Sequence, residues 1–312
     1  MMSGHIVSIG EALVDMIEIS DDTQPTYVAA WGGSPFNVAV GAHRLGSEVE
    51  FAGSFANDAL GQKMRQFLES EGVGIDLCPV VDECYTTIAM ASFVGPEPQY
   101  AFYANPASYG FVPPAIANRQ QVVSASVVHT GSLAVLEDMT YEAITEAFRA
   151  TDGLITFDPN VRPRMVQDWA EYRNRLGQLI NSSDFVKISI EDLEAAYPNQ
   201  SVDSLASATL DGRAQALLVT RGGDPVTIVT EHGSTDVPLH GKLPVVDTTG
   251  AGDATMAAMI HQLALHGLPN DHDGWVAMTQ NALVVAAIVS SQRGAAPSMP
   301  TKQAAEEAGA RF

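Results

Sequence analysis

Residues 247–253 are Asp-Thr-Thr-Gly-Ala-Gly-Asp, and an apolar segment with the composition of a buried helix, 254–266, follows them. A glycine-rich turn that opens a helix lets backbone N–H groups approach an anion, and the helix dipole favours a phosphate at that place. Asp253 would repel such a phosphate, which makes sense if its carboxylate takes the proton of an alcohol that attacks phosphorus. The alternative is an acidic N-cap after a flexible turn.

Around this stretch, short β-branched runs alternate with segments of helical periodicity. The expected strands are 6–9, 127–129, 154–157, 185–188 and 216–219, and the expected helices are 36–45, 60–71, 141–149, 169–180, 191–197, 254–266 and 275–290. The alternation is typical of a mostly parallel sheet with helices on both faces. It predicts a single α/β domain over residues 1–312, a three-layer αβα sandwich.

Two stretches interrupt the alternation with strands that no helix separates. They are 14–19 with 27–30, and 86–93 with 99–104 joined through Gly95-Pro96. Such strands indicate a small inserted sheet, with lid segments at about 14–31 and 84–110. We expect this lid to lie over the carboxyl edge of the main sheet, where folds of this class bind ligands.

The composition indicates a small-molecule protein of the cytoplasm. Its 16 basic and 37 acidic residues give a formal charge of −21, which argues against nucleic-acid and anionic-membrane partners. No apolar run approaches the roughly 18 residues of a membrane span, and residues 1–9 lack the pattern of a signal peptide. The two cysteines form neither a disulfide framework nor a CxxC metal site.

A second motif, Trp-Gly-Gly-Ser-Pro-Phe-Asn at 31–37, precedes an expected helix. Its glycines allow close approach to a ligand, Ser34 is a predicted N-cap, and Pro35 suits the first helical position. The amide of Asn37 can donate to and accept from sugar hydroxyls. Asp15 falls where the first strand leaves the sheet, and its carboxylate can accept two vicinal hydroxyls. The alternative for the motif is an ordinary glycine turn with a helix cap. The alternative for Asp15 is a solvated acid in a turn.

Together these motifs resemble the ribokinase-like (phosphofructokinase B-type) carbohydrate kinases, and among them the bacterial fructokinases. The similar stretches run nearly end to end and in the family's order: 9–15, 32–39, 157–163, 186–189, 219–223 and 247–253. The last of these is the most specific. The resemblance implies a ribokinase-like fold and the ATP-dependent transfer of a phosphoryl group to a hydroxyl of fructose or a close relative.

The resemblance also implies roles for residues at the predicted reaction site. Asp253 is then the general base for the sugar hydroxyl, and an anion hole for the transferring phosphoryl group is formed by Gly250, Ala251 and Gly252. Asp15, Gly33 and Asn37 line the sugar site. Arg162 either contacts the sugar or phosphate or is an ordinary salt-bridged loop arginine.

Further implied roles concern ATP. Lys187 and Thr220 reach its phosphates, and Gly222 allows close approach there. Ser189, directly after the expected strand that contains Lys187, is also among the cofactor-binding residues. Asn281 either contacts adenine or is a polar residue on a helix face.

Two metal sites follow from the same resemblance. Mg²⁺ travels with the ATP phosphates, since a dedicated protein cage is unusual for it. Asp192, which stands where the family has the glutamate of an Asn-x-x-Glu motif, holds it through water, unless the adjacent Glu191 does. A monovalent cation, usually K⁺, is held by the loops of Asp247, Thr249, Gly294 and Ser298, whose oxygen chemistry suits a hard cation.

Departures from the fructokinase pattern leave the substrate open. Ala104 replaces an arginine and Tyr109 an aspartate, so the pocket loses a charge and gains an aromatic ring, which suits a different polyol or a neutral sugar. The alternatives are a kinase of 2-keto-3-deoxygluconate, whose carboxylate Arg162 or Arg164 would meet, a pentose or nucleoside kinase, or a catalytically silent sugar-binding sensor. Lids of this kind often pair between subunits, so a homodimer through the exposed lid edge is a further expectation.

Overall fold

The main sheet of this computed structural model, which describes residues 4–19, 24–93, 98–241 and 243–312, has eight strands. They are β1 (His5–Ile9), β4 (Glu48–Ala52), β9 (Val127–Gly131), β10 (Leu154–Asp158), β11 (Phe185–Ser189), β12 (Ala216–Arg221), β13 (Asp224–Thr230) and β14 (Gly233–Val237). Their order is β14-β13-β12-β11-β10-β9-β1-β4, and neighbouring strands pair parallel except on the two sides of β13, which runs opposite to the other seven. The predicted α/β class with a mostly parallel sheet is therefore confirmed; the antiparallel edge was not predicted.

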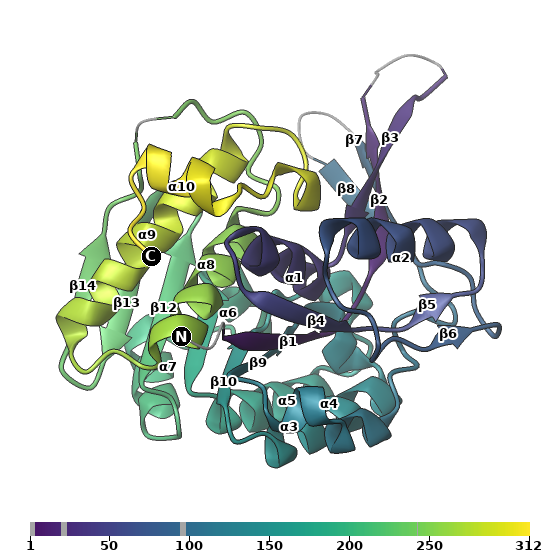
Figure 1. The fold of residues 1–312 in the computed structure, drawn as a ribbon. Coiled ribbons are helices and arrows are strands. Elements are labelled where there is room, and N and C mark those ends of the chain that lie inside the picture. Colours follow the sequence, from purple (N-terminus) through teal and green to yellow (C-terminus); the bar gives the residue numbers. More distant parts are fainter. Residues whose placement is uncertain (1–3, 20–23, 94–97, 242) are drawn as a thin grey trace.

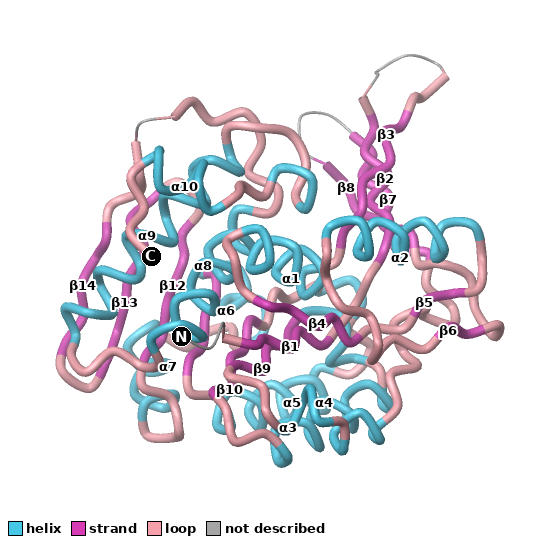
Figure 2. Tube along the Cα trace, viewed as in Figure 1, coloured by secondary structure: helices cyan, strands magenta, loops and turns pink. Residues whose placement is uncertain are grey.

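Helices cover both faces of this sheet (Figures 1 and 2). One face carries α1 (Ser34–Arg44), α2 (Ala59–Glu71), α8 (Ala251–His266), α9 (His272–Ser290) and α10 (Lys302–Ala308); the other carries α3 (Gln120–Val123), α4 (Asp138–Ala150), α5 (Trp169–Ser182), α6 (Ile190–Ala196) and α7 (Val202–Leu210). Each expected helix is present within a few residues of its predicted bounds. The sequence analysis missed α3, α7 and α10, which have 4, 9 and 7 residues.

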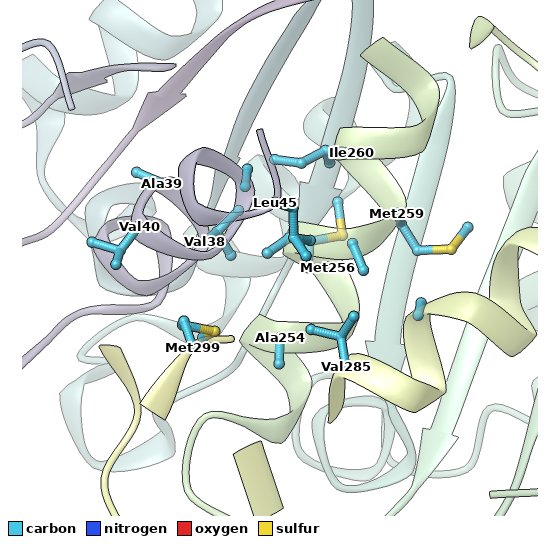
Figure 3. Packing of buried hydrophobic residues seen from close by; sticks show 14 of the residues in the cluster. Val38, Ala39, Val40, Leu45, Ala254, Met256, Met259, Ile260, Val285 and Met299 are labelled. Carbon is cyan, nitrogen blue, oxygen red and sulfur yellow. The ribbon is translucent and has the colours of Figure 1, made fainter. Parts of the chain in front are cut away.

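The helix that follows residues 247–253 is buried at the centre of one layer. Figure 3 shows α8 packed against α1 and α9 through fully buried side chains such as Val38, Met256 and Val285. Gly41 permits this approach, because a Cβ there would lie 2.7 Å from the Cβ of Ala257. Close packing on all sides fixes the start of α8, and with it Asp253, relative to the sheet.

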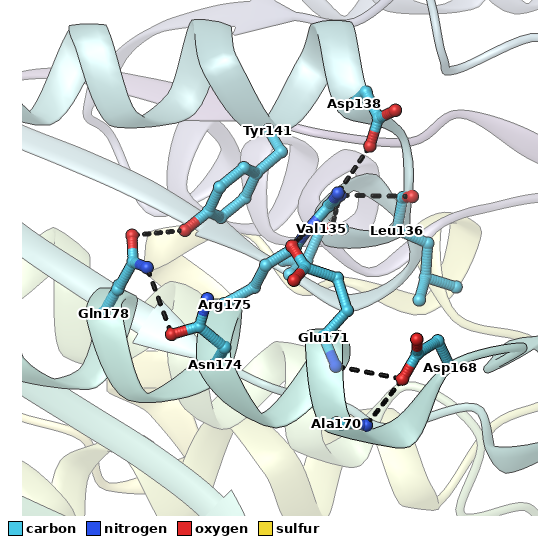
Figure 4. A network of polar contacts seen from close by, with 10 residues as sticks. All are labelled: Val135, Leu136, Asp138, Tyr141, Asp168, Ala170, Glu171, Asn174, Arg175 and Gln178. Carbon is cyan, nitrogen blue, oxygen red and sulfur yellow. Dashed lines mark hydrogen bonds and ion pairs between the residues drawn. The ribbon is translucent and has the colours of Figure 1, made fainter.

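On the face of the main sheet opposite α8, a network of polar contacts holds the turn that follows β9 (Figure 4). Arg175 of α5 donates to the carbonyls of Val135 and Leu136 in the 3₁₀ helix η2 (Ser132–Leu136), at 3.1 and 3.3 Å. Its guanidinium also pairs with Asp138 and Glu171 and lies over the ring of Tyr141. Because η2 begins at the carboxyl end of β9, this network sets one wall of the pocket described below.

A separate four-stranded sheet stands out from the body (Figure 1). Its strands are β2 (Leu13–Glu18), β3 (Tyr27–Gly32), β7 (Ile88–Phe93) and β8 (Pro98–Tyr103), in the order β3-β2-β7-β8. Both predicted strand pairs are confirmed, although the turn at Gly95-Pro96 lies outside the described residues. β5 (Phe55–Ala56) and β6 (Val80–Val81) form a further, separate two-stranded parallel sheet. Over the described ranges, no helix is long and apolar enough to cross a membrane.

Candidate active site

Asp253 lies in the first turn of α8 and is almost fully buried. Its Oδ1 accepts a hydrogen bond from the Ser34 hydroxyl and its Oδ2 one from the Asn37 amide nitrogen, both at 2.7 Å. Burial raises the pKa of Asp253, and the two hydrogen bonds together with Lys187 and Arg162 oppose that rise without cancelling it. The two glycine motifs, more than 200 residues apart in the chain, therefore meet at one carboxylate.

Ser34 does not have the role that the sequence suggested. The N-cap of α1 is Gly33, with φ 108°, and no side chain caps the helix, so the prediction of a Ser34 cap was wrong. A Cβ at Gly33 would lie 2.3 Å from the Glu11 carbonyl oxygen, so only glycine suits that position. Ser34 becomes the first residue of the helix, and its hydroxyl is left for Asp253.

The turn before Asp253 has the geometry of an anion site. Gly250 is the N-cap of α8, with φ 81°, and a Cβ there would lie 2.6 Å from the Cβ of Ala295. Ala251 and Gly252 follow as the first helical residues. The Ala251 N–H donates to the Thr248 carbonyl at 3.1 Å within the turn, and the Gly252 N–H is at a position that has no partner inside the helix. Beneath them, the Lys187 ammonium lies 3.4 Å from the position that a Gly252 Cβ would take. Backbone donors and a buried cation thus surround the place where a phosphoryl group is expected.

A cavity of about 490 Å³ opens onto Asp253. The structure brings the predicted sugar-site residues together in its lining: Asp15, Gly33, Asn37 and Arg162. Among the described residues, the Asn37 Oδ1 has no hydrogen-bond partner although it is buried. It is an acceptor available to a ligand hydroxyl.

The lid closes one side of this cavity with Ile17, Ala89, Tyr100 and Phe102. The guanidinium of Arg164 donates to the Tyr100 carbonyl at 2.9 Å and so ties the lid to the loop after β10. The carboxylate of Asp15 projects from the lid strand β2 into the same space. Burial raises its pKa to about 6, the Arg162 charge opposes the rise, and the Asp253 carboxylate adds to it.

Glu11 is a site residue that the sequence analysis did not name. It is buried in the cavity lining, and its carboxylate accepts the backbone N–H groups of Ser34 at 3.0 Å and Ala134 at 3.3 Å. Burial raises its pKa to about 7 against these hydrogen bonds. Glu11 therefore joins the start of α1 to η2. The available signal was an acidic residue two positions after the buried strand β1, which leads into the site.

Lys187 is held by a partner that the sequence did not indicate. Its ammonium forms an ion pair with Asp158 on the neighbouring strand, at 2.6 Å, and both side chains are buried. Burial disfavours the charged lysine, but the carboxylates of Asp158, Asp192 and Asp253 outweigh that effect and raise its pKa. Lys187 therefore carries a positive charge under the glycine turn. Its contact with phosphates stays a prediction.

The other predicted nucleotide residues divide into two groups. Ser189 and Thr220 are register partners at the carboxyl ends of β11 and β12, and Gly222, with φ 55°, lies exposed in the turn to β13. Their nucleotide contacts stay predictions. Asn281 has another role: its amide group donates to the Arg311 carbonyl and the Gln262 side chain and accepts the Arg311 N–H. The amide of Asn281 thus holds the C-terminal segment on α9, and its adenine contact stays a prediction.

Both carboxylate oxygens of Asp192 accept hydrogen bonds from backbone N–H groups of the protein. One carboxylate oxygen accepts the Val161 N–H at 2.6 Å, and the other completes a capping box with Ser189. The described ranges contain no group of three or more His, Cys, Asp or Glu residues that could hold a metal ion. The donor set does not fit a direct Mg²⁺ site. A contact through water stays a prediction.

The residues of the predicted monovalent-cation site lie close to the glycine turn. Asp247 accepts the N–H groups of Thr249 at 2.9 Å and Gly294 at 3.1 Å, and these hydrogen bonds lower its pKa against the opposing effect of burial. The Ser298 hydroxyl donates to the Arg293 carbonyl at 2.8 Å. The two loops are therefore joined, and their oxygens have the chemistry that suits a hard cation. Occupation by K⁺ stays a prediction.

Comparisons with known proteins identify the family of this chain. A family model described as pfkB family carbohydrate kinase matches residues 3–302. A fructokinase of Klebsiella pneumoniae is 30% identical over 308 residues, covering 96% of this chain and 98% of the relative, and one of Salmonella typhimurium is 29% identical over 304 residues, covering 96% and 97%. The crystal structure of a fructokinase with bound ATP from Xylella fastidiosa has a TM-score of 0.89 at 26% identity and covers 98% of both chains. The family match and the shared fold confirm the resemblance seen in the motifs, and the chain belongs to the pfkB family of carbohydrate kinases, phosphotransferases with an alcohol group as acceptor.

Proposed function

We propose that this protein transfers the γ-phosphoryl group of ATP to a hydroxyl of a neutral sugar, D-fructose or a close relative. One observation carries the proposal: the Asp253 carboxylate, oriented by Ser34 and Asn37, lies between the glycine turn and a cavity lined by polar side chains. That arrangement supports a reaction in which a base works beside an anion site and a sugar-sized space. The fructokinase names of the relatives and the ATP bound to the Xylella protein support the same assignment.

The proposed reaction uses few protein groups. Asp15 and the Asn37 Oδ1 bind sugar hydroxyls, and the attacking hydroxyl faces Asp253. Asp253 takes its proton while the sugar oxygen bonds to the γ-phosphorus, and the bond from that phosphorus to the bridging oxygen of ADP breaks. Charge on the transferring group is stabilised by the N–H groups of residues 250–252 and by the dipole of α8.

The lid has a role in the same proposal. Tyr100 and Phe102 line the cavity from the lid side, so lid closure on a bound sugar would remove water from the reacting phosphoryl group. Hydrolysis of ATP by water, in the absence of sugar, is therefore expected to be slow. Pairing of two copies through the lid is part of the proposal as well.

An apolar cluster beside the pocket favours a neutral sugar. Ala104 and Tyr109 lie in an apolar cluster with Leu13 and Leu133 beside the cavity, where the fructokinase pattern has charged residues. A second candidate is a keto-sugar acid such as 2-keto-3-deoxygluconate. It is favoured by Arg162 and Arg164, which both line the cavity and could meet a carboxylate.

Mg²⁺ and K⁺ belong to the proposal in different ways. The protein offers no cage for Mg²⁺ among its described residues, so we propose that Mg²⁺ enters with ATP. The joined loops of Asp247 and Gly294 would hold K⁺ beside the glycine turn. A bound cation there would supply positive potential near the anion site. The proposed location is the cytoplasm.

The test is ADP release with Mg-ATP and K⁺ across D-fructose, tagatose, ribose, adenosine and 2-keto-3-deoxygluconate. Asp253→Asn is expected to retain sugar and nucleotide binding and to lower turnover by at least ~10²-fold. Asp273→Asn is a matched control, because Asp273 also lies in the first turn of a helix but is exposed. Unchanged turnover in Asp253→Asn would remove the assignment of the base. ATP binding without turnover of any acceptor would favour the silent sensor.

A further inference from the structure

Ser34 is fixed between two buried carboxylates. Its hydroxyl donates to the Asp253 Oδ1 at 2.7 Å, and its backbone N–H donates to the Glu11 Oε1 at 3.0 Å. The residue is 5% exposed and lines the cavity. A serine at a helix start usually caps the helix, but Gly33 occupies the N-cap here. The Ser34 hydroxyl therefore has Asp253 as its partner instead of the helix.

We propose that Ser34 is a positioning residue of the phosphoryl transfer, whose hydroxyl orients the Asp253 carboxylate and keeps it ionised until the sugar proton arrives. This inference rests on the proposed function, in which Asp253 is the base. It deepens that function by assigning a residue of the glycine motif to the base rather than to the sugar.

The charges around Asp253 make this donor important. Two acids, Asp15 on β2 and Asp158 on β10, disfavour a further negative charge, and two cations, Lys187 on β11 and Arg162 after β10, favour it. Glu11 is a further acid near this place, and it accepts the backbone N–H of Ser34. Because burial also disfavours the ionised carboxylate, the balance depends on donors that contact it directly. Those donors are Ser34 and Asn37.

Ser34 and Asn37 differ in the contacts that they offer besides those to Asp253. Asn37 also offers its Oδ1 to the cavity, so a change there would alter sugar binding as well as the base. The single hydroxyl of Ser34 is used for Asp253. A Ser34 variant therefore tests the effect on the base with less disturbance of the sugar site.

The chain provides a matched control. Ser8 is fully buried, and its hydroxyl donates to the Pro35 carbonyl at 2.8 Å, one residue from Ser34. Ser8→Ala removes a buried hydroxyl hydrogen bond from the same helix start but leaves Asp253 untouched. Ser34→Ala removes the bond to Asp253. A loss of local packing should affect both variants, whereas an effect on the base should affect only Ser34→Ala.

The experiment measures kcat against pH at saturating concentrations of the accepted sugar and Mg-ATP. In this profile the acid limb, which is the fall of kcat toward low pH, reports the pKa values of groups in the enzyme–substrate complex. Ser34→Ala is expected to move that limb to higher pH by about one unit, since it removes a hydrogen bond to a charged group. Above the limb its kcat should approach that of the wild type. Ser8→Ala should keep the wild-type limb and lose only thermal stability. Ser34→Thr retains the hydroxyl and should restore the limb.

The outcomes separate the two proposals. If Ser34→Ala superimposes on the wild type while Asp253→Asn is inactive, the role of Ser34 is overturned and the proposed base survives. If Asp253→Asn is fully active, the proposed function itself fails. Should Ser34→Ala not fold, Ser34→Cys fills the same space with a weaker donor. Its acid limb is then expected to shift in the same direction, and an unshifted limb would overturn the inference.

Discussion

The Lys187–Asp158 ion pair is expected to be one of the most sensitive points of the fold. Its atoms lie 2.6 Å apart, and the two side chains are 5% and 1% exposed. Removing one partner of a buried pair leaves an uncompensated charge and typically costs about 3–5 kcal/mol of the free energy of unfolding. The two single variants should not be equal, because other acids lie close to the pair.

Asp158→Asn leaves the ammonium with Asp192 and Asp253 as neighbours, which also favour its charge. We expect a cost near the lower limit, about 3 kcal/mol. Lys187→Met removes the one cation that Asp158, Asp192 and Asp253 share, and its cost should be near the upper limit, about 5 kcal/mol. With an unfolding entropy of about 2.1 cal/mol/K per residue over 312 residues, these costs lower Tm by about 5 and 8 °C.

The Lys187→Met deficit should depend on pH. Burial raises the pKa of Asp158, and the Lys187 charge opposes that rise. Without the lysine, the folded-state pKa rises further above its unfolded value. A group with a raised folded-state pKa contributes stability at low pH that is lost as the pH rises through that pKa. The deficit should therefore be smaller at pH 5 than at pH 8.

The assay is urea unfolding of the wild type, both single variants and the double variant Asp158→Asn/Lys187→Met. The double variant should be more stable than the sum of the single changes by at least ~2 kcal/mol, since it leaves no unpaired partner. Arg149→Met is the control, because its pair with Glu146 is exposed and should cost under ~1 kcal/mol. Single variants within ~1 kcal/mol of the wild type would refute this account of the pair.

Two further predictions concern the site. Gly250→Ala places a Cβ 2.6 Å from Ala295 at φ 81°, and the displaced N–H groups should lower kcat by ~10²-fold or more. Gly267→Ala, at φ 73° with open space around it, should lose stability only, and equal kcat values in the two variants would contradict this view. Because burial raises the pKa of Asp15 to about 6, the sugar KM should increase as the pH falls through that value. Asp15→Asn should remove that pH dependence, and a retained dependence would assign it to another group.

Much of the architecture followed from local pattern. The β-branched runs and the helical periodicities predicted the parallel strands and the longer helices, because each segment must bury one face whatever its neighbours are. The glycine turn before Asp253 was predictive for a similar reason. A turn with φ 81° followed by an apolar helix constrains the backbone locally, so the turn could be predicted without reference to distant residues, and its anion-binding role stays a prediction.

The partners of the polar side chains were decided by the tertiary structure alone. Ser34 carries the local signal of a helix cap, yet its hydroxyl donates to a carboxylate 219 positions away. Asn281 lies on a polar stretch of α9, and only the path of the C-terminal segment shows that its amide is occupied. Lys187 and Asp158 become a pair because β10 and β11 are adjacent in the sheet. Periodicity determines which side chains are buried, whereas packing between elements determines which buried polar atoms meet, and that contact sets the charge of the site.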